Sequence, residues 1–187
     1  MVDLKLLLLA TAGIDPVTKG PTEAGIWRLT TANEAIRNGL CSVVAIIGGR
    51  RLFGKNEAEV YYEYAKKYFP ALADRIVIVD ASATCTNRDL LAAGPKIDKY
   101  LASVGESRTT TAIIIVSYDR HMDRMEIALR WMGFSSILRI NSLEKPEYPW
   151  WKEALTYWVT RFDPAWRGLA GRLLVCVADR RLKEDAT

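Results

Sequence analysis

The sequence is short of the residues and patterns that mark several classes of protein. Its three cysteines, Cys41, Cys85 and Cys176, are scattered and odd in number, which fits neither a disulfide framework nor paired zinc ligands. Its apolar runs, such as Leu6–Ala10, fall far short of the about 20 residues that a membrane-spanning helix needs. The N-terminal residues are also a poor match to a secretory signal. We therefore expect a cytoplasmic protein.

The sequence also lacks a strong excess of charge of either sign, and it has little histidine. The chain has 26 Lys and Arg against 22 Asp and Glu, and these charges are spread along it without a long block of one sign. We therefore expect no nucleic-acid partner. Histidine occurs once, at His121, and with scattered acidic residues it makes no recognised ligand set, so no metal site is predicted. The GxGxxG pattern of dinucleotide-binding proteins is missing.

What the sequence does have is a regular alternation of two kinds of segment. Half of its 187 residues are apolar, which is enough for one substantial core. Nearly continuous apolar runs of strand length lie at 4–10, 42–47, 75–79, 112–116 and 136–140, and segments with helical spacing lie at 23–38, 57–68, 87–103 and 122–131. This alternation predicts an α/β fold, a doubly wound parallel sheet of about five strands that are buried on both faces.

The pattern changes after residue 145. Pro146 and Pro149 mark a break, and four of the six tryptophans follow it. Asp163 and Pro164 are a good helix start, and the apolar residues from 166 to 177 fall on one helical stripe. We predict a sheet domain over 1–145 and a Trp-rich helical extension over 146–187 that packs on it.

The Trp-rich extension could also contact other molecules. A homo-oligomer that forms through its helices is one hypothesis. From Lys145 to Thr187 there are eight basic and six acidic residues, and a membrane-binding face would need a larger positive surplus. We therefore expect no membrane contact.

The segments that follow the predicted strands carry the polar residues of interest, because ligands of open α/β sheets bind at the carboxyl ends of the strands. Gly48 and Gly49 end the second strand, where they make either a plain turn or a place of close ligand approach. Glu57 opens the next helix, where a carboxylate also interacts favourably with the helix dipole.

A second polar segment, DASATCTN, follows the third strand. Thr84, Thr86 or Asn87 would serve as a helix N-cap there. One cap needs only one such residue, so the surplus, which includes Asp80 and Ser82, favours a polar cradle for phosphate, carboxylate or sugar hydroxyls.

The third polar segment, SYDRH, leads into the helix that contains His121. Ser117 and Asp119 precede the histidine, and Arg124 follows it on the same helical face. The positive end of a helix disfavours an imidazolium, so we expect a neutral His121 that can accept or donate a proton. A structural histidine and a catalytic one are equally compatible with this position.

Several of these segments together resemble one family. RLTTANEAIRNGLCSVVAIIGG, EAEVYYEYA and VSYDRHMDRM are similar, in that order, to the motifs of YdcF-like proteins, the ElyC/SanA/YdcF group, a domain family of unknown function. The likeness covers about residues 4 to 160, and the His-Met-x-Arg element is its most specific part. The family's Ser-x-x-Thr-x-x-Asn spacing begins here on Ala81, with Ser82 one residue late.

The resemblance implies a Rossmann-like fold and a polar pocket. Carried over by position, the pocket would consist of Arg28, Gly48, Gly49, Glu57, Thr84, Asn87, His121 and Arg124. We also expect Ser82 and Ser117, where the sequence departs from the family pattern, to bind the ligand. Some members of the family have roles in envelope or peptidoglycan-precursor metabolism, and one branch binds S-adenosylmethionine.

Two functions fit these residues. The first is an enzyme, a hydrolase or transferase that acts on a small anionic, phosphate-bearing or nucleotide-like molecule. Arg28 and Arg124 would hold the negative charge, and His121 with Glu57 would transfer protons. The second is a non-catalytic sensor that binds S-adenosylmethionine or a nucleotide in the same place.

Overall fold

The fold is built on one parallel sheet. The computed structural model describes residues 4–82, 86–144 and 150–165, with only the backbone of Thr86 and Asn87. Five parallel strands lie in the order β5-β2-β1-β6-β7, and their bounds are Lys5–Ala10 (β1), Val43–Ile47 (β2), Ile76–Asp80 (β5), Ala112–Ser117 (β6) and Ser136–Asn141 (β7). This arrangement confirms the predicted α/β, Rossmann-like doubly wound sheet.

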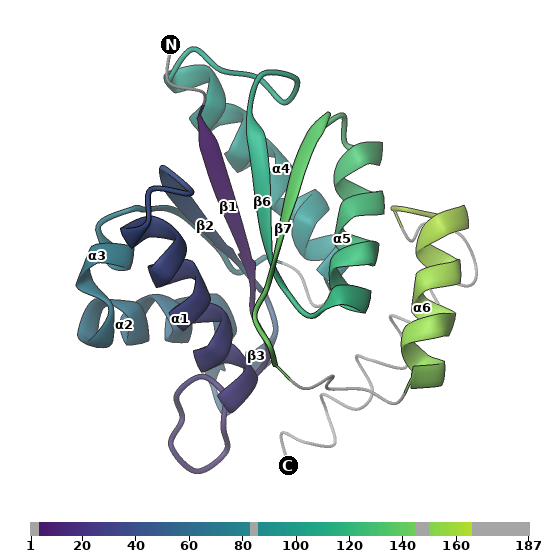
Figure 1. The fold of residues 1–187 in the computed structure, drawn as a ribbon. Coiled ribbons are helices and arrows are strands. Elements are labelled where there is room, and N and C mark those ends of the chain that lie inside the picture. Colours follow the sequence, from purple (N-terminus) through teal and green to yellow (C-terminus); the bar gives the residue numbers. More distant parts are fainter. Residues whose placement is uncertain (1–3, 83–85, 145–149, 166–187) are drawn as a thin grey trace.

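Helices cover both faces of this sheet (Figure 1). The connections from β1 to β2 and from β2 to β5 lie on one face, and those from β5 to β6 and from β6 to β7 lie on the other. The helices are Glu23–Arg37 (α1), Glu57–Tyr68 (α2), Pro70–Ala73 (α3), Thr86–Ser103 (α4), Asp119–Trp131 (α5) and Trp150–Phe162 (α6). The last of these, α6, packs on the outer side of α5.

The core forms because the central strands are apolar on both faces. Alternate side chains of a strand point to opposite faces. Leu6 and Leu8 of β1 belong to the cluster beneath α4 and α5, whereas Leu7 and Leu9 belong to the cluster beneath α1 and α2. All four leucines are fully buried, which explains why this strand reads as a continuous apolar run.

Three local features differ from the sequence-based expectations. The strand β7 is a sheet edge with mostly exposed side chains, so the prediction that every strand is buried on both faces is wrong there. A small hairpin of β3 (Arg51–Leu52) and β4 (Lys55–Asn56) follows β2, with left-handed backbone at Phe53 and Gly54 in its turn. The helix α5 begins at Asp119, three residues before its predicted start, so His121 lies inside its first turn.

The C-terminal region is described only in part. Its helix α6 falls within the described residues, but the predicted apolar stripe of 166–177 and the break at Pro146 and Pro149 lie outside them. Within the described part of the chain, no helix is both long and apolar enough to cross a membrane.

Candidate functional site

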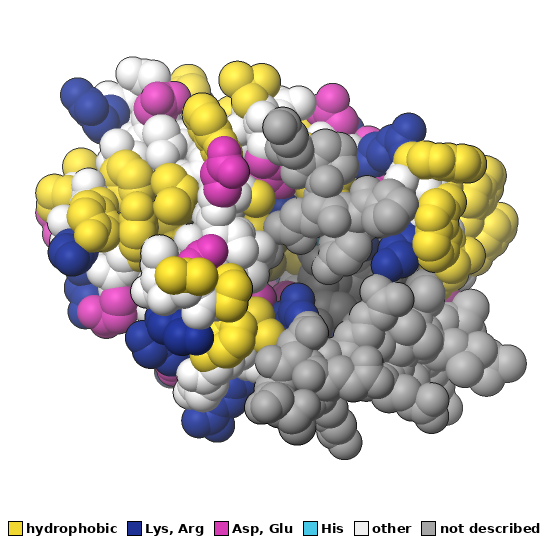
Figure 2. Space-filling model, turned by 90° about the horizontal axis from the view of Figure 1, so that it is seen from below, with side chains coloured by type: hydrophobic (Ala, Val, Ile, Leu, Met, Phe, Trp, Pro, Cys, Tyr) yellow, Lys and Arg dark blue, Asp and Glu magenta, His cyan; other side chains and the backbone are white. Residues whose placement is uncertain are grey.

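The candidate site lies where the order of the strands reverses. The chain moves from β1 outward through β2 to β5, then returns to the other side of β1 with β6. In doubly wound sheets this switch point opens a crevice at the carboxyl ends of the two central strands, and ligands bind there. Here it lies between the residues after Ala10 and those from Ser117 onward, on the side of the molecule that Figure 2 shows.

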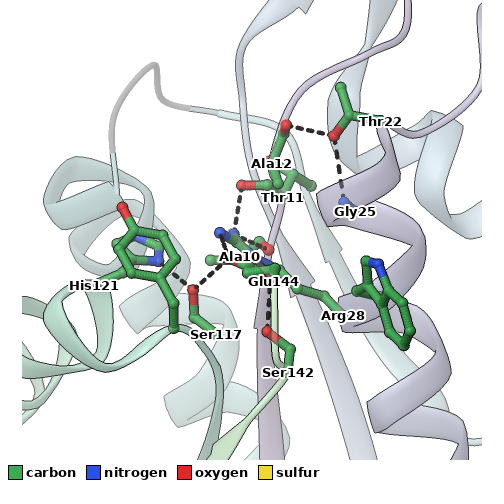
Figure 3. Close-up of polar contacts among 12 residues, drawn as sticks. Ala10, Thr11, Ala12, Thr22, Gly25, Arg28, Ser117, His121, Ser142 and Glu144 are labelled. Atoms are coloured by element: carbon green, nitrogen blue, oxygen red, sulfur yellow. Dashed lines mark hydrogen bonds and ion pairs between the residues drawn. The ribbon is translucent and has the colours of Figure 1, made fainter. Parts of the chain in front are cut away.

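A buried ion pair crosses the switch point. Arg28 reaches from α1 to Glu144, which follows β7, and its Nε lies 2.7 and 2.9 Å from the two carboxylate oxygens (Figure 3). Its Nη1 donates to the carbonyl oxygens of Ala10 and Thr11 at 2.9 and 3.0 Å. Both charged side chains are almost completely buried. The guanidinium expected to hold an anionic ligand therefore already has a carboxylate partner within the chain.

His121 is connected to the same carboxylate through a hydroxyl group. Ser117 Oγ lies 2.8 Å from His121 Nδ1 and 3.2 Å from Glu144 Oε1 (Figure 3). Ser142 donates its own hydroxyl proton to the other oxygen of Glu144, at 2.9 Å. The chain Glu144–Ser117–His121 thus links the segment after β7 to the junction of β6 and α5, 27 residues earlier in the sequence.

The position of the Ser117 proton follows from this geometry. The hydroxyl has one proton and two neighbours, and a carboxylate oxygen can only accept it. If Ser117 donated to the imidazole instead, its oxygen would face Glu144 Oε1 at 3.2 Å without a proton between them, which is costly in a buried site. Ser117 therefore donates to Glu144, His121 donates from Nδ1, and the lone pair of the neutral ring is on Nε2.

His121 is held in its neutral form. Burial lowers the pKa of its imidazole well below 6.5, and the charges of Arg124 and Arg28 lower it further. Only 4% of the residue is exposed. The sequence also predicted a neutral histidine, but from the positive end of the helix, whereas in the structure burial is the main cause of the lowered pKa.

On the β2 side of the switch point lies a carboxyl group with a raised pKa. Thr11 donates its hydroxyl proton to Glu57 Oε2 at 2.5 Å. Burial raises the pKa of Glu57, and this hydrogen bond and the charges of Arg50 and Arg28 only partly oppose the rise. Glu57 begins α2, as the sequence predicted, and is itself buried.

The two glycines after β2 have structural roles: Gly48 leaves room for a neighbouring side chain, and the N–H groups of both form hydrogen bonds within the chain. A Cβ atom on Gly48 would lie 1.8 Å from Thr11 Oγ1, so only glycine leaves room for the Thr11–Glu57 hydrogen bond. The N–H of Gly48 donates to Asp80 O at 2.9 Å, and that of Gly49 donates to Asp89 Oδ1 at 3.3 Å. Both N–H groups thus already have acceptors within the chain.

Asp89 is a second carboxyl group with a displaced pKa. It lies in the first turn of α4, and burial raises its pKa to about 7. The hydrogen bond from Gly49 opposes this rise, whereas the negative charges of Glu57 and Asp80 add to it. Asp80 is buried at the end of β5, with Oδ2 3.3 Å from Lys96 Nζ. Three carboxyl groups thus share the end of β2 and β5.

The segment after β1 is fixed by its own contacts. The Ala12 N–H donates to Tyr61 Oη at 2.7 Å, and Ala12 O accepts from the Thr22 hydroxyl at 2.7 Å. Thr22 also caps α1 by accepting from the Gly25 N–H (Figure 3). A Cβ on Gly25 would lie 2.0 Å from Tyr61 Oη, so this glycine is needed for the close contact. Thr11 is thereby held at the switch point.

Arg124 pairs with a second buried glutamate. Its Nη2 lies 3.2 Å from Glu153 Oε2, and Glu153 comes from α6. Tyr118 donates its hydroxyl proton to Glu153 Oε1 at 2.5 Å and its ring stacks on that of His121, with the centroids 5.6 Å apart. The buried Arg124 Nε has no hydrogen-bond partner in the described structure, so this arginine retains one donor.

The remaining predicted residues are described only in part. Ser82 donates from both its N–H and its hydroxyl to Asp80 Oδ1, and its side chain is exposed. Thr84 and the side chain of Asn87 lie outside the described residues. Among the described residues, no group of three or more His, Cys, Asp or Glu side chains could hold a metal ion.

The structure thus brings most of the predicted residues to one end of the sheet. Arg28, Ser117 and His121 join one network, while Glu57, Gly48 and Gly49 join another beside it. Sequence reasoning missed Thr11, Asp89, Glu144 and Glu153, which are the partners of the predicted residues. Thr11 alone left a signal, because it directly follows the first predicted strand.

Comparison with known proteins adds no relative. No protein-family model, no curated protein and no solved structure matches the chain. The resemblance to YdcF-like proteins therefore stays a prediction.

Proposed function

We propose that the chain is an enzyme that binds a small anionic or nucleotide-like molecule at the switch point and performs hydrolase or transferase chemistry on a phosphate-bearing substrate. One observation carries this proposal. Three ionisable groups with displaced pKa values, Glu57, Asp89 and His121, lie at the same end of one sheet. Displaced pKa values gather at functional sites because burial and neighbouring charges there keep acids and bases in the protonation state that catalysis needs.

The proposed roles follow from the protonation states. The neutral His121 ring, with its lone pair on Nε2, would accept a proton from the attacking hydroxyl group or water. Glu57, whose pKa burial raises, would donate a proton to the leaving group. In this way two groups in different surroundings would supply the base and the acid of one reaction.

Two features support anion binding. The Nε of Arg124 is a buried donor without a described acceptor, and an anionic oxygen would satisfy it. The N-terminus of α5 lies at the switch point, and Tyr118 at its N-cap makes no side-chain capping bond, so the positive end of this helix favours a negative ligand. In this proposal Arg28 orients Glu144 and does not bind the ligand.

A second candidate, the non-catalytic sensor of a nucleotide or S-adenosylmethionine, is favoured by a different observation. His121 is almost fully buried, and Arg28 and Arg124 each contact a buried glutamate. Such contacts also suit a rigid binding module in which the histidine has only a structural role.

The test is a turnover assay with phosphate monoesters and nucleotides as substrates. We expect His121→Gln to lower turnover by ~100-fold or more while the affinity for substrate changes little, because the change removes a proton acceptor and leaves the anion contacts. Glu57→Gln should lower turnover too. Its matched control is Glu63→Gln, an exposed glutamate of the same helix that pairs with Lys66, which should leave turnover unchanged.

Other outcomes would decide against the enzyme. Binding of a nucleotide or S-adenosylmethionine by calorimetry, without turnover of any substrate, would favour the sensor. A large loss of stability in His121→Gln would show that His121 is a structural residue.

A further inference from the structure

The helix α6 carries an exposed aromatic face that has no role in the candidate site. Trp151, Leu155, Trp158 and Phe162 recur three or four residues apart, so they form one stripe along the helix. Between 47 and 80% of each of these residues is exposed. The stripe lies on the outer side of the molecule, away from α5, and Figure 2 shows hydrophobic side chains gathered there.

The opposite face of α6 holds its only acidic side chain. Glu153 is 2% exposed and is neutralised by Arg124 and by the hydroxyl of Tyr118. The helix is therefore attached to α5 through a buried polar contact. As a result, its aromatic stripe points outward and no carboxylate of α6 lies beside it.

Positive charges flank the stripe. Lys152 and Arg161 lie on its two sides by helical spacing, and the Lys152 ammonium is 5.5 Å from the centre of the Trp151 ring. The exposed Arg120 of α5 adds a third cation, 3.5 Å from Trp150 O. The nearby acids Asp123 and Glu126 are both paired with Arg139. Lys152, Arg161 and Arg120 thus outnumber Asp163, the acid that follows Phe162 at the end of α6.

We propose that this face of α6 binds the surface of an anionic lipid bilayer, with the aromatic side chains among the lipid headgroups and the basic side chains at the phosphates. An amphipathic helix with Trp, Phe and Leu on one face and Lys or Arg beside it is suited to the plane of the interface. Tryptophan favours this depth because its ring is apolar and its N–H is polar. The cations complement the negative potential of anionic lipids.

This proposal reverses the expectation from charge counting over residues 145–187. That count treats every charge as if it faced the same surface. The structure shows instead that the one acid of α6 faces inward and its two cations flank the outer stripe. The orientation of the charges, and not their sum, decides which surface they can bind.

Vesicle co-sedimentation of the full chain tests the proposal. We expect binding to vesicles of phosphatidylcholine with phosphatidylglycerol, and weaker binding to phosphatidylcholine alone or at high salt. The double variant Trp158→Ser with Phe162→Ser should lower the partition coefficient by roughly tenfold or more, because it removes two anchoring rings. The matched control is Trp131→Ser, a half-exposed tryptophan at the end of α5, which should bind like the wild type.

Two results would overturn the proposal. The first is wild-type protein that does not sediment with anionic vesicles, or does so equally well after the double substitution. The second is a dimer in sedimentation velocity that Trp158→Ser with Phe162→Ser converts to monomer, since the stripe would then be covered by a second copy of the chain. Neither result depends on whether the switch point is catalytic.

Discussion

At the scale of single residues, the Ser117 hydroxyl decides which nitrogen of His121 carries the proton. Because Ser117 donates to Glu144, we expect the Nδ1–H form of a neutral ring. The chain has one histidine, so its ring nitrogens can be assigned in a nitrogen-15 NMR spectrum without ambiguity. The spectrum should show a protonated Nδ1 and a bare Nε2, and the ring should stay neutral well below pH 6.5 because burial lowers its pKa.

Two serine variants separate this explanation from simple burial. Ser117→Ala removes the oxygen that accepts the Nδ1 proton, so the population should shift toward the Nε2–H form. Ser142→Ala removes a hydroxyl from the same carboxylate and should leave the tautomer unchanged. A wild-type ring protonated on Nε2 would contradict the inferred direction of the Ser117 bond.

Residue types could be predicted better than their partners. His121 and Glu57 were identifiable because each stands at the start of a predicted helix that follows a strand. Glu144 and Glu153 were not, because each meets its arginine only after residues more than 25 positions apart come together. A sequence shows that an arginine is present, but not that a distant carboxylate neutralises it.

At the scale of elements, the contact between α4 and the end of β2 should depend on pH. Asp89 of α4 accepts from Gly49 beside Glu57 and Asp80, and its pKa rises from 3.8 to about 7 in the folded chain. The folded state therefore binds this proton more tightly than the unfolded state does. The protonated Asp89 side chain therefore contributes fully to the free energy of unfolding below about pH 4, and this contribution is lost as the pH rises toward 7.

Asp89→Asn should remove this loss, because the amide is neutral and its oxygen can still accept from Gly49. In chemical denaturation at pH 8 we expect the variant to be more stable than the wild type by on the order of 2 kcal/mol, with little difference at pH 4. Asp98→Asn, on the same helix but exposed and paired with Arg108, is the control and should not be stabilising. If the difference in stability between Asp89→Asn and the wild type were the same at pH 4 and pH 8, the raised pKa of Asp89 would be contradicted.

Elements were predicted well where burial dictates the pattern. The helix α2 has the predicted bounds, and each strand agrees to within one residue at either end. The hairpin of β3 and β4 was missed because its two-residue strands are too short to show alternation. The exposed β7 was expected to be buried because position at a sheet edge depends on strand order, which an apolar run does not encode.

At the scale of the whole molecule, the order of the strands creates the candidate site. The reversal between β1 and β6 brings Thr11 and Ser117 to the same end of the sheet, with Arg28 and Glu144 bonded across it. The central claim is that a small anionic molecule binds at this place.

Backbone amide shifts in NMR test that claim most directly. The spectrum would be recorded during titration with adenosine monophosphate and, separately, with inorganic phosphate. We predict that the largest changes fall in residues 11–13, 48–50 and 117–121, at and just after the carboxyl ends of β1, β2 and β6. Changes confined to the opposite ends of the strands or to α6, or no saturable change with either molecule, would contradict it.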